Sequence, residues 1–341
     1  MRKLDKSKKA RSFRLARARY AAKRHSKKWK DRKKNKKVIN LKLKLKKQKQ
    51  KKKPFKSIPA PRNFSLIENT DEVLAYFKKV EHELKNGENV ILDISDVDVL
   101  TPATIALMVA SLNDPDFHHD SLIQGNAPKK PDLYQLFTES GFYGYVKTHG
   151  RFKCNKKNLL HKEVHRKVVP DVAKDAALTG IRHVFDRDTP FEPLYEILVE
   201  CMSNTNSHAD LYEQGKCNWW LYAYSEPKTN IASYSFLDLG VGIFKSAVVQ
   251  NYLKKLFKGT MIYKNINLVD DLLAGKLQSR ADIDNEIRGK GIPQIVEHSK
   301  SKNFKTFFII ANDVKINLKT GAKEQLDQEL KGTFMYWELQ N

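Results

Sequence analysis

The pattern of hydrophobic and polar positions predicts alternating helices and strands once the chain has passed residue 63. Apolar residues recur at helical spacing over Asp71–Leu84, and the apolar run Asn89–Ser95 is typical of a buried strand. Thr101-Pro102 supplies a capping hydroxyl and a first-turn proline for a second helix. A short strand at Ile123–Gly125 and a helix over Leu133–Phe142 complete this segment.

The second half of the chain repeats this alternation. Helical periodicity covers Leu194–Ala209, and an apolar strand followed by a glycine turn covers Ser235–Ile243. A Gly-Lys-Gly loop then opens a helix at Gly291, and the apolar runs Phe304–Ala311 and Lys331–Leu339 are typical of buried strands. The predicted fold class is therefore α/β, as two α+β sandwich domains in succession.

Charge separates the N-terminal segment, residues 1–58, from everything that follows. Residues 1–60 contain 28 Lys and Arg and two Asp, a net charge of +26, whereas the other 281 residues contain 35 basic and 37 acidic side chains, a net charge of −2. Repulsion between like charges predicts a basic arm that is disordered alone and helical over Ala10–Lys30 once neutralised. Leu41–Lys46 alternates apolar and basic residues, which fits one amphipathic strand.

This basic arm suits a polyanion, because each phosphate that a basic side chain neutralises releases counterions. Phe13, Tyr20 and Trp29 add rings that can stack on unpaired bases. We therefore expect RNA or DNA binding. A solubilising tail is the alternative, and a membrane surface is disfavoured because the arm has no broad apolar face. The expected nucleic-acid contacts are Arg11, Arg14, Arg17, Arg19, Lys23, Arg24, Lys27 and Lys28.

The run from Val90 to Leu100, with the helix start after it, resembles the central strand and turn of STAS domains, the fold of anti-sigma-factor antagonists. The resemblance covers residues 59–148. In that family the turn usually reads Asp-Ser-Ser-Gly, and its first serine accepts phosphate from a partner kinase. Here the turn is Thr101-Pro-Ala-Thr104, so the acceptor position is Pro102, which has no hydroxyl. We expect a docking or dimer-shaping domain rather than a phosphorylation switch.

Three polar residues fall on one face of the predicted helix Leu194–Ala209. Glu200, Asn204 and His208 are spaced at i, i+4 and i+8, which places them in one stripe. A carboxylate one turn from an amide can hold a water and a Mg²⁺ ion beside a triphosphate. For this helix taken alone, an exposed polar stripe is the alternative.

Two glycine-rich turns follow this helix. Asp238-Leu-Gly-Val-Gly242 places a carboxylate at the end of a strand, where it can accept a hydrogen bond from an adenine amino group. Its two glycines let the backbone turn closely, although a plain tight turn also fits them. Gly289-Lys-Gly291 opens a helix whose N–H groups suit phosphate, and Arg288 and Lys290 add positive charge.

Taken in order, these motifs resemble the GHKL ATPase superfamily, the Bergerat fold, over residues 175–341. Its members include type II topoisomerases, ninety-kilodalton heat-shock chaperones, MutL mismatch-repair proteins and histidine kinases. Glu200-x-x-x-Asn204 matches its N-box, the two glycine turns match its glycine boxes, and Gly332-Thr333 matches its final Gly-Thr motif. His208-Ala209 resembles the ending of the N-box in kinase-like members, with simple packing beside the pocket as the alternative.

The resemblance implies specific roles. Asn204 would coordinate Mg²⁺, Asp238 would read adenine, and Glu200 would be the catalytic residue that polarises water or, in a kinase, a hydroxyl. Residues 244–288 would form a lid over ATP, with Lys276 as one phosphate contact. The ATP-binding residues implied are Asn204, His208, Asp238, Gly240, Gly242, Arg280, Arg288, Gly289, Lys290, Gly291 and Thr333.

Other candidate chemistry is weaker. Segment 149–174 is predicted to be a charged linker with a helix around His161 and His165, where no third metal ligand is evident. The helical hairpin expected around a histidine-kinase phosphoacceptor is missing there. The three cysteines lack CxxC spacing, which argues against a disulfide framework and a zinc site and fits a reducing cytoplasm.

The leading hypothesis is a Mg²⁺-dependent ATPase whose nucleotide state controls how nucleic acid or a partner protein is held. A serine/threonine kinase of anti-sigma-factor type and a non-enzymatic ATP-bound adaptor are the alternatives. We expect ATP and Mg²⁺ as cofactors and a protein partner, and leave a homodimer open. No membrane span is expected, because no run of eighteen apolar residues occurs. A cytoplasmic location, with nucleoid or ribosome association left open, and a bacterial or phage-related defence setting complete the expectations.

Overall fold

The computed structural model describes residues 53–146, 159–164, 168–208, 218–248, 264–279 and 291–341. Contacts divide the chain into two compact units, Met1–Phe55 and Lys56–Asn341, and the second unit holds both predicted folded domains. The expected helix, strand and nucleic-acid contacts of the basic arm lie outside the described residues. None of the helices in the described part is long and apolar enough to cross a membrane.

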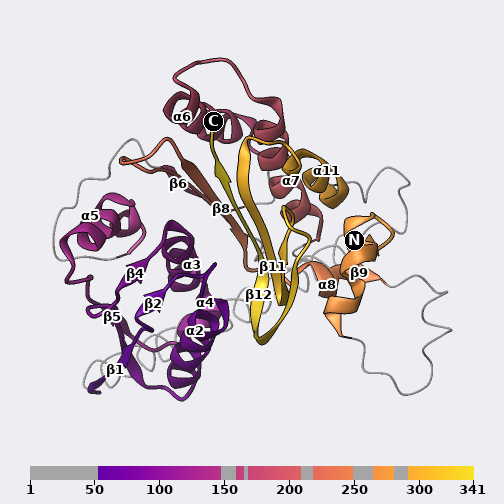
Figure 1. Ribbon diagram of the computed structural model, residues 1–341. Coiled ribbons are helices and arrows are strands. Elements are labelled where there is room, and N and C mark those ends of the chain that lie inside the picture. The colour runs from indigo at the N-terminus through magenta and orange to yellow at the C-terminus, as the bar shows by residue number, and fades with distance from the viewer. Residues whose placement is uncertain (1–52, 147–158, 165–167, 209–217, 249–263, 280–290) are drawn as a thin grey trace, which may run out of the picture. The chain divides into compact units, whose positions relative to one another are not determined.

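Helices and strands alternate along the chain in a mixed α/β fold (Figure 1). The helices are α2 (Thr70–Lys85), α3 (Pro102–Asn113), α4 (Pro115–His118), α5 (Pro131–Glu139), α6 (Pro170–Phe185), α7 (Glu192–His208), α8 (Ile243–Ser246), α10 (Val269–Leu273) and α11 (Gly291–Ser299), with 3-10 turns η1 (Phe142–Gly144) and η2 (Asn265–Leu268). The strands are β1 (Phe55–Pro59), β2 (Asn63–Phe64), β3 (Asn89–Asp93), β4 (Val99–Leu100), β5 (Ile123–Gly125), β6 (Leu159–Val164), β7 (Asn218–Ser225), β8 (Ala232–Asp238), β9 (Ala247–Val248), β10 (Gln278–Ser279), β11 (Phe304–Asn317) and β12 (Lys323–Leu339).

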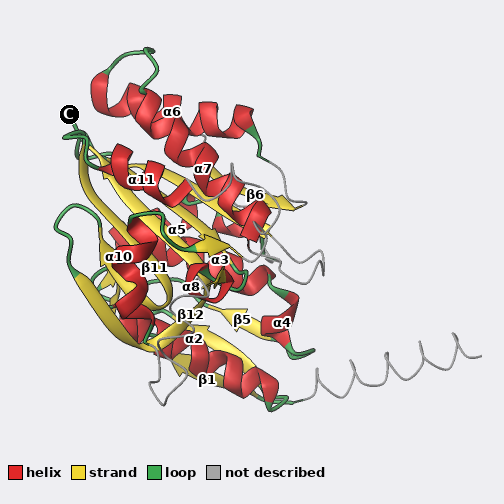
Figure 2. Cartoon of the chain, turned by 90° about the vertical axis from the view of Figure 1, so that its right-hand side faces the viewer, coloured by secondary structure: helices red, strands yellow, loops and turns green. Residues whose placement is uncertain are grey.

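A five-stranded antiparallel sheet of order β11-β12-β8-β7-β6 organises the second half of the chain. Successive strand residues point to opposite faces, so Trp219 and Leu221 join one apolar cluster while Trp220 and Tyr222 join another. Helices α6 and α7 pack on the first face, with α11 beside α7 (Figure 2). Helices α2 and α3 pack on the second face. Because both faces are covered, strand β8 is buried along its whole length.

The N-terminal part of the fold contains a small sheet of order β1-β3-β5, in which β3 and β5 run parallel. Its apolar residues and those on the second face of the five-stranded sheet form one continuous cluster. Polar contacts reinforce this packing: the Asp71 carboxylate accepts hydrogen bonds from the backbone N–H groups of Asp327 and Gln328, at 2.9 and 3.1 Å. Lys315 donates to the carbonyl of Ile67 at 2.7 Å. The two predicted domains therefore share a core.

The turn that resembles a STAS phosphoacceptor is tied into this core. The Thr101 hydroxyl accepts a hydrogen bond from the backbone N–H of Thr104 at 3.4 Å, so Thr101 caps helix α3, as the sequence predicts. The Thr104 side chain is fully buried; its hydroxyl accepts from the N–H of Leu66 at 2.9 Å and donates to the carbonyl of Phe64 at 2.8 Å. Both hydroxyls of the turn are therefore committed to structure.

Segment 149–174 differs from the expected helical linker. Leu159–Val164 form strand β6, which pairs antiparallel with β7, so His161 lies on a sheet strand and the prediction of a helix there is wrong. Helix α6 also begins at Pro170, before the expected boundary at residue 175. Strand β6 is at the edge of the five-stranded sheet, and its pairing with β7 is a tertiary contact that a local window of sequence does not reveal.

The last two strands are longer than the sequence predicts. Strand β11 continues six residues past Ala311, and β12 begins at Lys323, so Gly332 lies inside a strand rather than at its start. The register between the two strands shifts between Ala311 and Asn312, which marks a bulge opposite Lys331 and Gly332. Gly332 has a φ of +94°, and a Cβ there would lie 1.9 Å from the carbonyl oxygen of Asp238. Only glycine fits this close approach.

Candidate nucleotide site

Helix α7 carries Glu200 and Asn204 on the side that its apolar residues leave free. Its buried apolar residues recur at helical spacing and are Leu194, Ile197, Leu198, Cys201 and Met202. Glu200 and Asn204 are both partly exposed, one turn apart. The side chain of His208, the third member of the predicted stripe, is not among those described.

The second glycine box lies against these two polar residues. Gly291 is the first residue of α11, and a Cβ at this position would lie 2.6 Å from Oδ1 of Asn204 and 2.8 Å from Oε2 of Glu200. Figures 1 and 2 both show α7 and α11 side by side. The fold thus brings Glu200 and Asn204 together with Gly291, which the sequence separates from them by about ninety positions. The first turn of α11, whose N–H groups have no partner within the helix itself, starts at this point.

Asp238 lies at the end of β8, where the first glycine box begins. Its side chain is 6 % exposed, and its Oδ1 accepts a hydrogen bond from the N–H of Gly240 at 2.9 Å. Thr333, which faces Asp238 across the β8–β12 pair, also hydrogen-bonds to it. Burial raises the pKa of Asp238 to about 6, and the bonds from Gly240 and Thr333 act against that rise. Three predicted residues therefore meet at one carboxylate.

Cys201 connects the helix to the strand end. Its buried Sγ lies 3.5 Å from the sulfur of Met335 on β12, which packs α7 onto the sheet. Burial raises the pKa of this thiol first, and the carboxylates of Glu200 and Asp238 raise it further. Cys201 is therefore a buried link between α7 and the sheet, and both carboxylates disfavour its thiolate.

Glu200 is also set apart by its electrostatic surroundings. Partial burial raises its pKa, the neighbouring carboxylate of Glu196 raises it further, and His298 opposes the rise. Nε2 of His298 on α11 lies 2.5 Å from Oε2 of Glu196. Sequence reasoning missed both neighbours, although Glu196 precedes Glu200 by one helical turn and His298 follows Gly291 by two.

Asn312 is a further residue that the sequence did not reveal. It is buried on β11 with a φ of +52°, its Nδ2 donates to the carbonyl of Val241 at 3.0 Å, and its Oδ1 accepts from the N–H of Phe244 at 3.2 Å. A Cβ on Gly242, which has a φ of +83°, would lie 2.6 Å from this amide. Asn312 thereby holds the first glycine box in place. In the sequence, a single asparagine at the end of an apolar run does not indicate that it will hold a distant glycine turn.

The residues present fit a magnesium-bound nucleotide. Nδ2 of Asn204 is buried and has no hydrogen-bond partner among the described residues. This N–H donor suits a phosphate oxygen, whereas Mg²⁺ would take the Oδ1 of the same amide. The described residues contain no group of three His, Cys, Asp or Glu that could hold a metal ion. Mg²⁺ in nucleotide sites takes one or two protein ligands and completes its shell with phosphate oxygens and water. One amide beside one carboxylate matches that requirement.

Several predicted contacts cannot be placed. Arg280, Arg288, Gly289 and Lys290 lie outside the described residues. In the expected lid, strands β9 and β10 pair with each other, and Leu268, Val269, Leu272 and Leu277 are buried in the core. Lys276 is exposed and lies 3.8 Å from the Asp271 carboxylate, so its ammonium already has a partner.

No protein-family model matches this chain, and no curated protein matches it significantly. The functional assignment therefore depends on the site residues themselves.

Proposed function

We propose that the chain is a Mg²⁺-dependent ATPase of the GHKL type, with its nucleotide site between α7, α11 and the end of β8. The observation that supports this most is the contact of Gly291 with Glu200 and Asn204 beside an unsatisfied amide. A buried polar group without a partner costs free energy, so an acceptor on a bound ligand would stabilise this amide.

Each residue has a distinct task in this proposal. Asp238 accepts a hydrogen bond from the adenine amino group, which its buried and mostly ionised carboxylate suits at neutral pH. Asn204 holds Mg²⁺, which when bound neutralises and orients the phosphate oxygens. Glu200 accepts a proton from the water whose oxygen bonds to the γ-phosphorus as the bond to the β-phosphate oxygen breaks. A raised pKa makes Glu200 a better base for this step.

The basic arm would tether this ATPase to nucleic acid, and we propose that the nucleotide state changes how the nucleic acid or a protein partner is held. The charge of the arm supports this, since a net charge of +26 on 60 residues exceeds what solubility requires. The satisfied hydroxyls of Thr101 and Thr104 favour a structural role for the STAS-like segment over a phosphorylation switch.

Labelled ATP tests whether the site hydrolyses ATP, transfers its phosphate to a protein or only binds it. The purified full-length chain is incubated with γ-labelled ATP and Mg²⁺, with and without RNA or DNA. We expect release of free phosphate that nucleic acid stimulates. Label transferred to a protein would instead support the kinase alternative, and binding with neither outcome would support the adaptor.

Removing residues 1–53 tests the arm. The deletion ends before β1, so all of the strands that the structure describes are kept. We expect loss of nucleic-acid binding whose affinity falls steeply with salt, and unchanged ATP affinity. Binding is measured by fluorescence anisotropy at several salt concentrations. Retention of salt-sensitive binding would contradict the arm assignment.

A further inference from the structure

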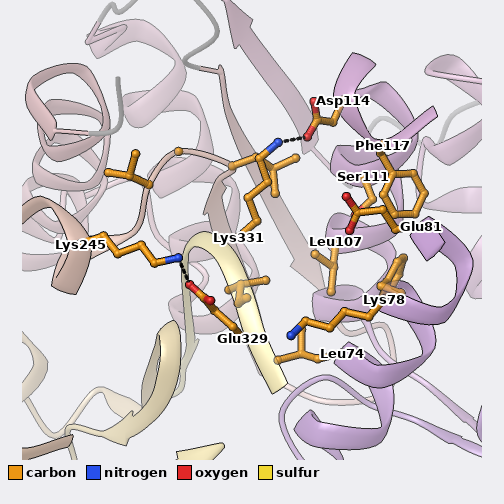
Figure 3. A pocket seen from close by; sticks show the side chains of 15 residues that line it. Leu74, Lys78, Glu81, Leu107, Ser111, Asp114, Phe117, Lys245, Glu329 and Lys331 are labelled. Atoms are coloured by element: carbon orange, nitrogen blue, oxygen red, sulfur yellow. Dashed lines mark hydrogen bonds and ion pairs between the residues drawn. The ribbon is translucent and has the colours of Figure 1, made fainter. Parts of the chain in front are cut away.

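A cavity of about 400 Å³ lies on the second face of the five-stranded sheet and borders the turn that follows Asp238. Its walls are α2 and α3 on one side, and the first glycine box with β12 on the other (Figure 3). Glu200, Asn204, Asp238 and Gly291 do not line it, and Gly240 is the residue that it shares with the predicted nucleotide contacts. Its volume falls within the range of small-molecule sites.

The lining combines an apolar floor with a charged rim. The apolar residues are Leu74, Phe77, Leu107, Phe117, Leu239 and Leu330. The rim has three lysines and three acids, and most of them neutralise one another: Lys331 lies 2.6 Å from Asp114, and Lys245 pairs with Glu329. An apolar body with a few charged groups around it is typical of sites that bind amphipathic small molecules.

Lys78 is the exception on this rim. It extends from α2 toward the interior of the cavity in Figure 3, and it has no ion pair or hydrogen bond with any described residue. The nearby carboxylate of Glu81 lies 3.7 Å from His119 rather than on Lys78. An unpaired ammonium above an apolar floor offers a contact to an anionic group.

Hydrogen bonds connect this cavity to the first glycine box. Oε1 of Glu329, on the cavity wall, accepts from Nδ2 of Asn312 at 3.1 Å as well as from Lys245. Asn312 in turn holds Val241 and Phe244. A molecule that contacts Glu329 or Lys245 therefore acts on the same hydrogen bonds that fix the turn after Asp238.

We propose that this cavity is a second ligand site, which binds a small amphipathic anion: an aromatic or aliphatic body on the apolar floor, with one phosphate or carboxylate group on Lys78. Occupancy steadies the segment 239–245 through Glu329 and Asn312. This site does not depend on the proposed ATPase activity.

Binding of 2-naphthyl phosphate to the full-length chain tests the proposal. For a ligand of this size we expect a dissociation constant below about 1 mM by calorimetry. 2-Naphthol lacks the anion and inorganic phosphate lacks the body, so each should bind at least about 10-fold more weakly. Hydrogen–deuterium exchange should slow in 239–245 and in α2. Absence of binding, or equal binding of inorganic phosphate, overturns the proposal.

Two lysine variants of α2 localise the effect. Lys78→Ala should weaken binding of 2-naphthyl phosphate about 5- to 10-fold by loss of a charge-assisted contact. Lys79→Ala is the matched control, because Lys79 is the next residue, is also exposed and does not line the cavity. Both variants keep the basic arm, so binding to the arm cancels in the comparison. Equal affinities of the two variants would overturn the assignment to this cavity.

Discussion

Two regions of this molecule carry polar side chains where phosphate chemistry is expected: the STAS-like turn and the candidate nucleotide site. They differ in whether those side chains are satisfied by hydrogen bonds within the protein. In the STAS-like turn, the hydroxyls of Thr101 and Thr104 each have hydrogen-bond partners, and Thr104 is fully buried. In the candidate nucleotide site, Asn204 has a buried amide nitrogen with no partner in the described part of the chain, and Asp238 is buried with a raised pKa. The hydroxyls of the STAS-like turn are satisfied within the fold, whereas the Asn204 amide is not satisfied by the described residues.

This difference separates structural from functional use of polar side chains. A satisfied buried hydroxyl stabilises the fold and gains nothing from a ligand. An unsatisfied amide and a desolvated carboxylate destabilise it, so substitutions there should relieve the fold while harming binding. A substitution in the candidate nucleotide site should therefore raise the free energy of unfolding and weaken ATP binding. A substitution of similar size in the STAS-like turn should lower the free energy of unfolding and leave ATP binding intact.

The largest effect is expected at Glu200. Glu200→Gln removes the base while keeping the shape of the side chain, and we expect ATP turnover to fall at least about 100-fold with ATP affinity changed less than about 3-fold. Glu192→Gln, two turns earlier on the same helix and exposed, is the matched control. Phosphate release under saturating ATP measures the effect. Unchanged turnover in Glu200→Gln would remove the catalytic assignment.

Two isosteric substitutions, Asp238→Asn in the candidate nucleotide site and Thr104→Val in the STAS-like turn, test this contrast. Asp238 titrates near 6 rather than 3.8, so the folded state binds this proton more tightly than the unfolded state does. The contribution of this group to stability is therefore full below pH 3.8 and is lost as the pH rises through about 6. At pH 7, Asp238→Asn should raise the free energy of unfolding by about 1–2 kcal/mol, below the limit of about 3 kcal/mol that two pKa units allow.

The same substitution should weaken ATP binding about 10- to 100-fold, because the carboxylate acceptor for the adenine amino group is lost. Thr104→Val in the other region should lower the free energy of unfolding by about 1–3 kcal/mol, since the N–H of Leu66 loses its acceptor, and leave ATP affinity intact. Urea unfolding and ATP titration of both variants provide the measurements. Destabilisation by both would refute the contrast.

An intermediate effect is expected at Gly291. Gly291→Ala adds a Cβ 2.6 Å from Oδ1 of Asn204, which must move, so ATP affinity should fall about 10-fold while the helix is retained. Gly144→Ala is the control, because no atom lies within 4 Å of its Cβ position. Thermal unfolding checks that both variants fold. Equal ATP affinities for the two would show that nothing binds against Gly291.

The smallest effect concerns pH. ATP binding through ionised Asp238 should weaken below pH 6, and we expect the dissociation constant to rise about 5- to 10-fold between pH 7 and pH 5. Asp238→Asn serves as the reference in the same titration, because ATP itself also takes up protons in this range. If both proteins show the same slope, Asp238 does not contact the nucleotide in its ionised form.

Most elements could be predicted from periodicity alone. The pattern over Asp71–Leu84 gave α2 to within one residue at each end, and Ile123–Gly125 matches β5. The errors fall where tertiary pairing decides. Strand β6 exists because β7 offers it an edge, and β12 extends to Lys323 because β11 extends with it. Neither partner is visible within a local window of sequence.

The sequence by itself determined the charge of the basic arm and nominated Glu200, Asn204, Asp238 and Gly291 for the candidate site, because spacing and composition are local properties. Only the tertiary structure decided that Gly291 contacts Glu200 and Asn204, that Asn312 and His298 belong to the surroundings of the site, and that Thr104 is closed to modification. Burial and hydrogen-bond satisfaction depend on segments far apart in the chain, so they emerge only when those segments pack.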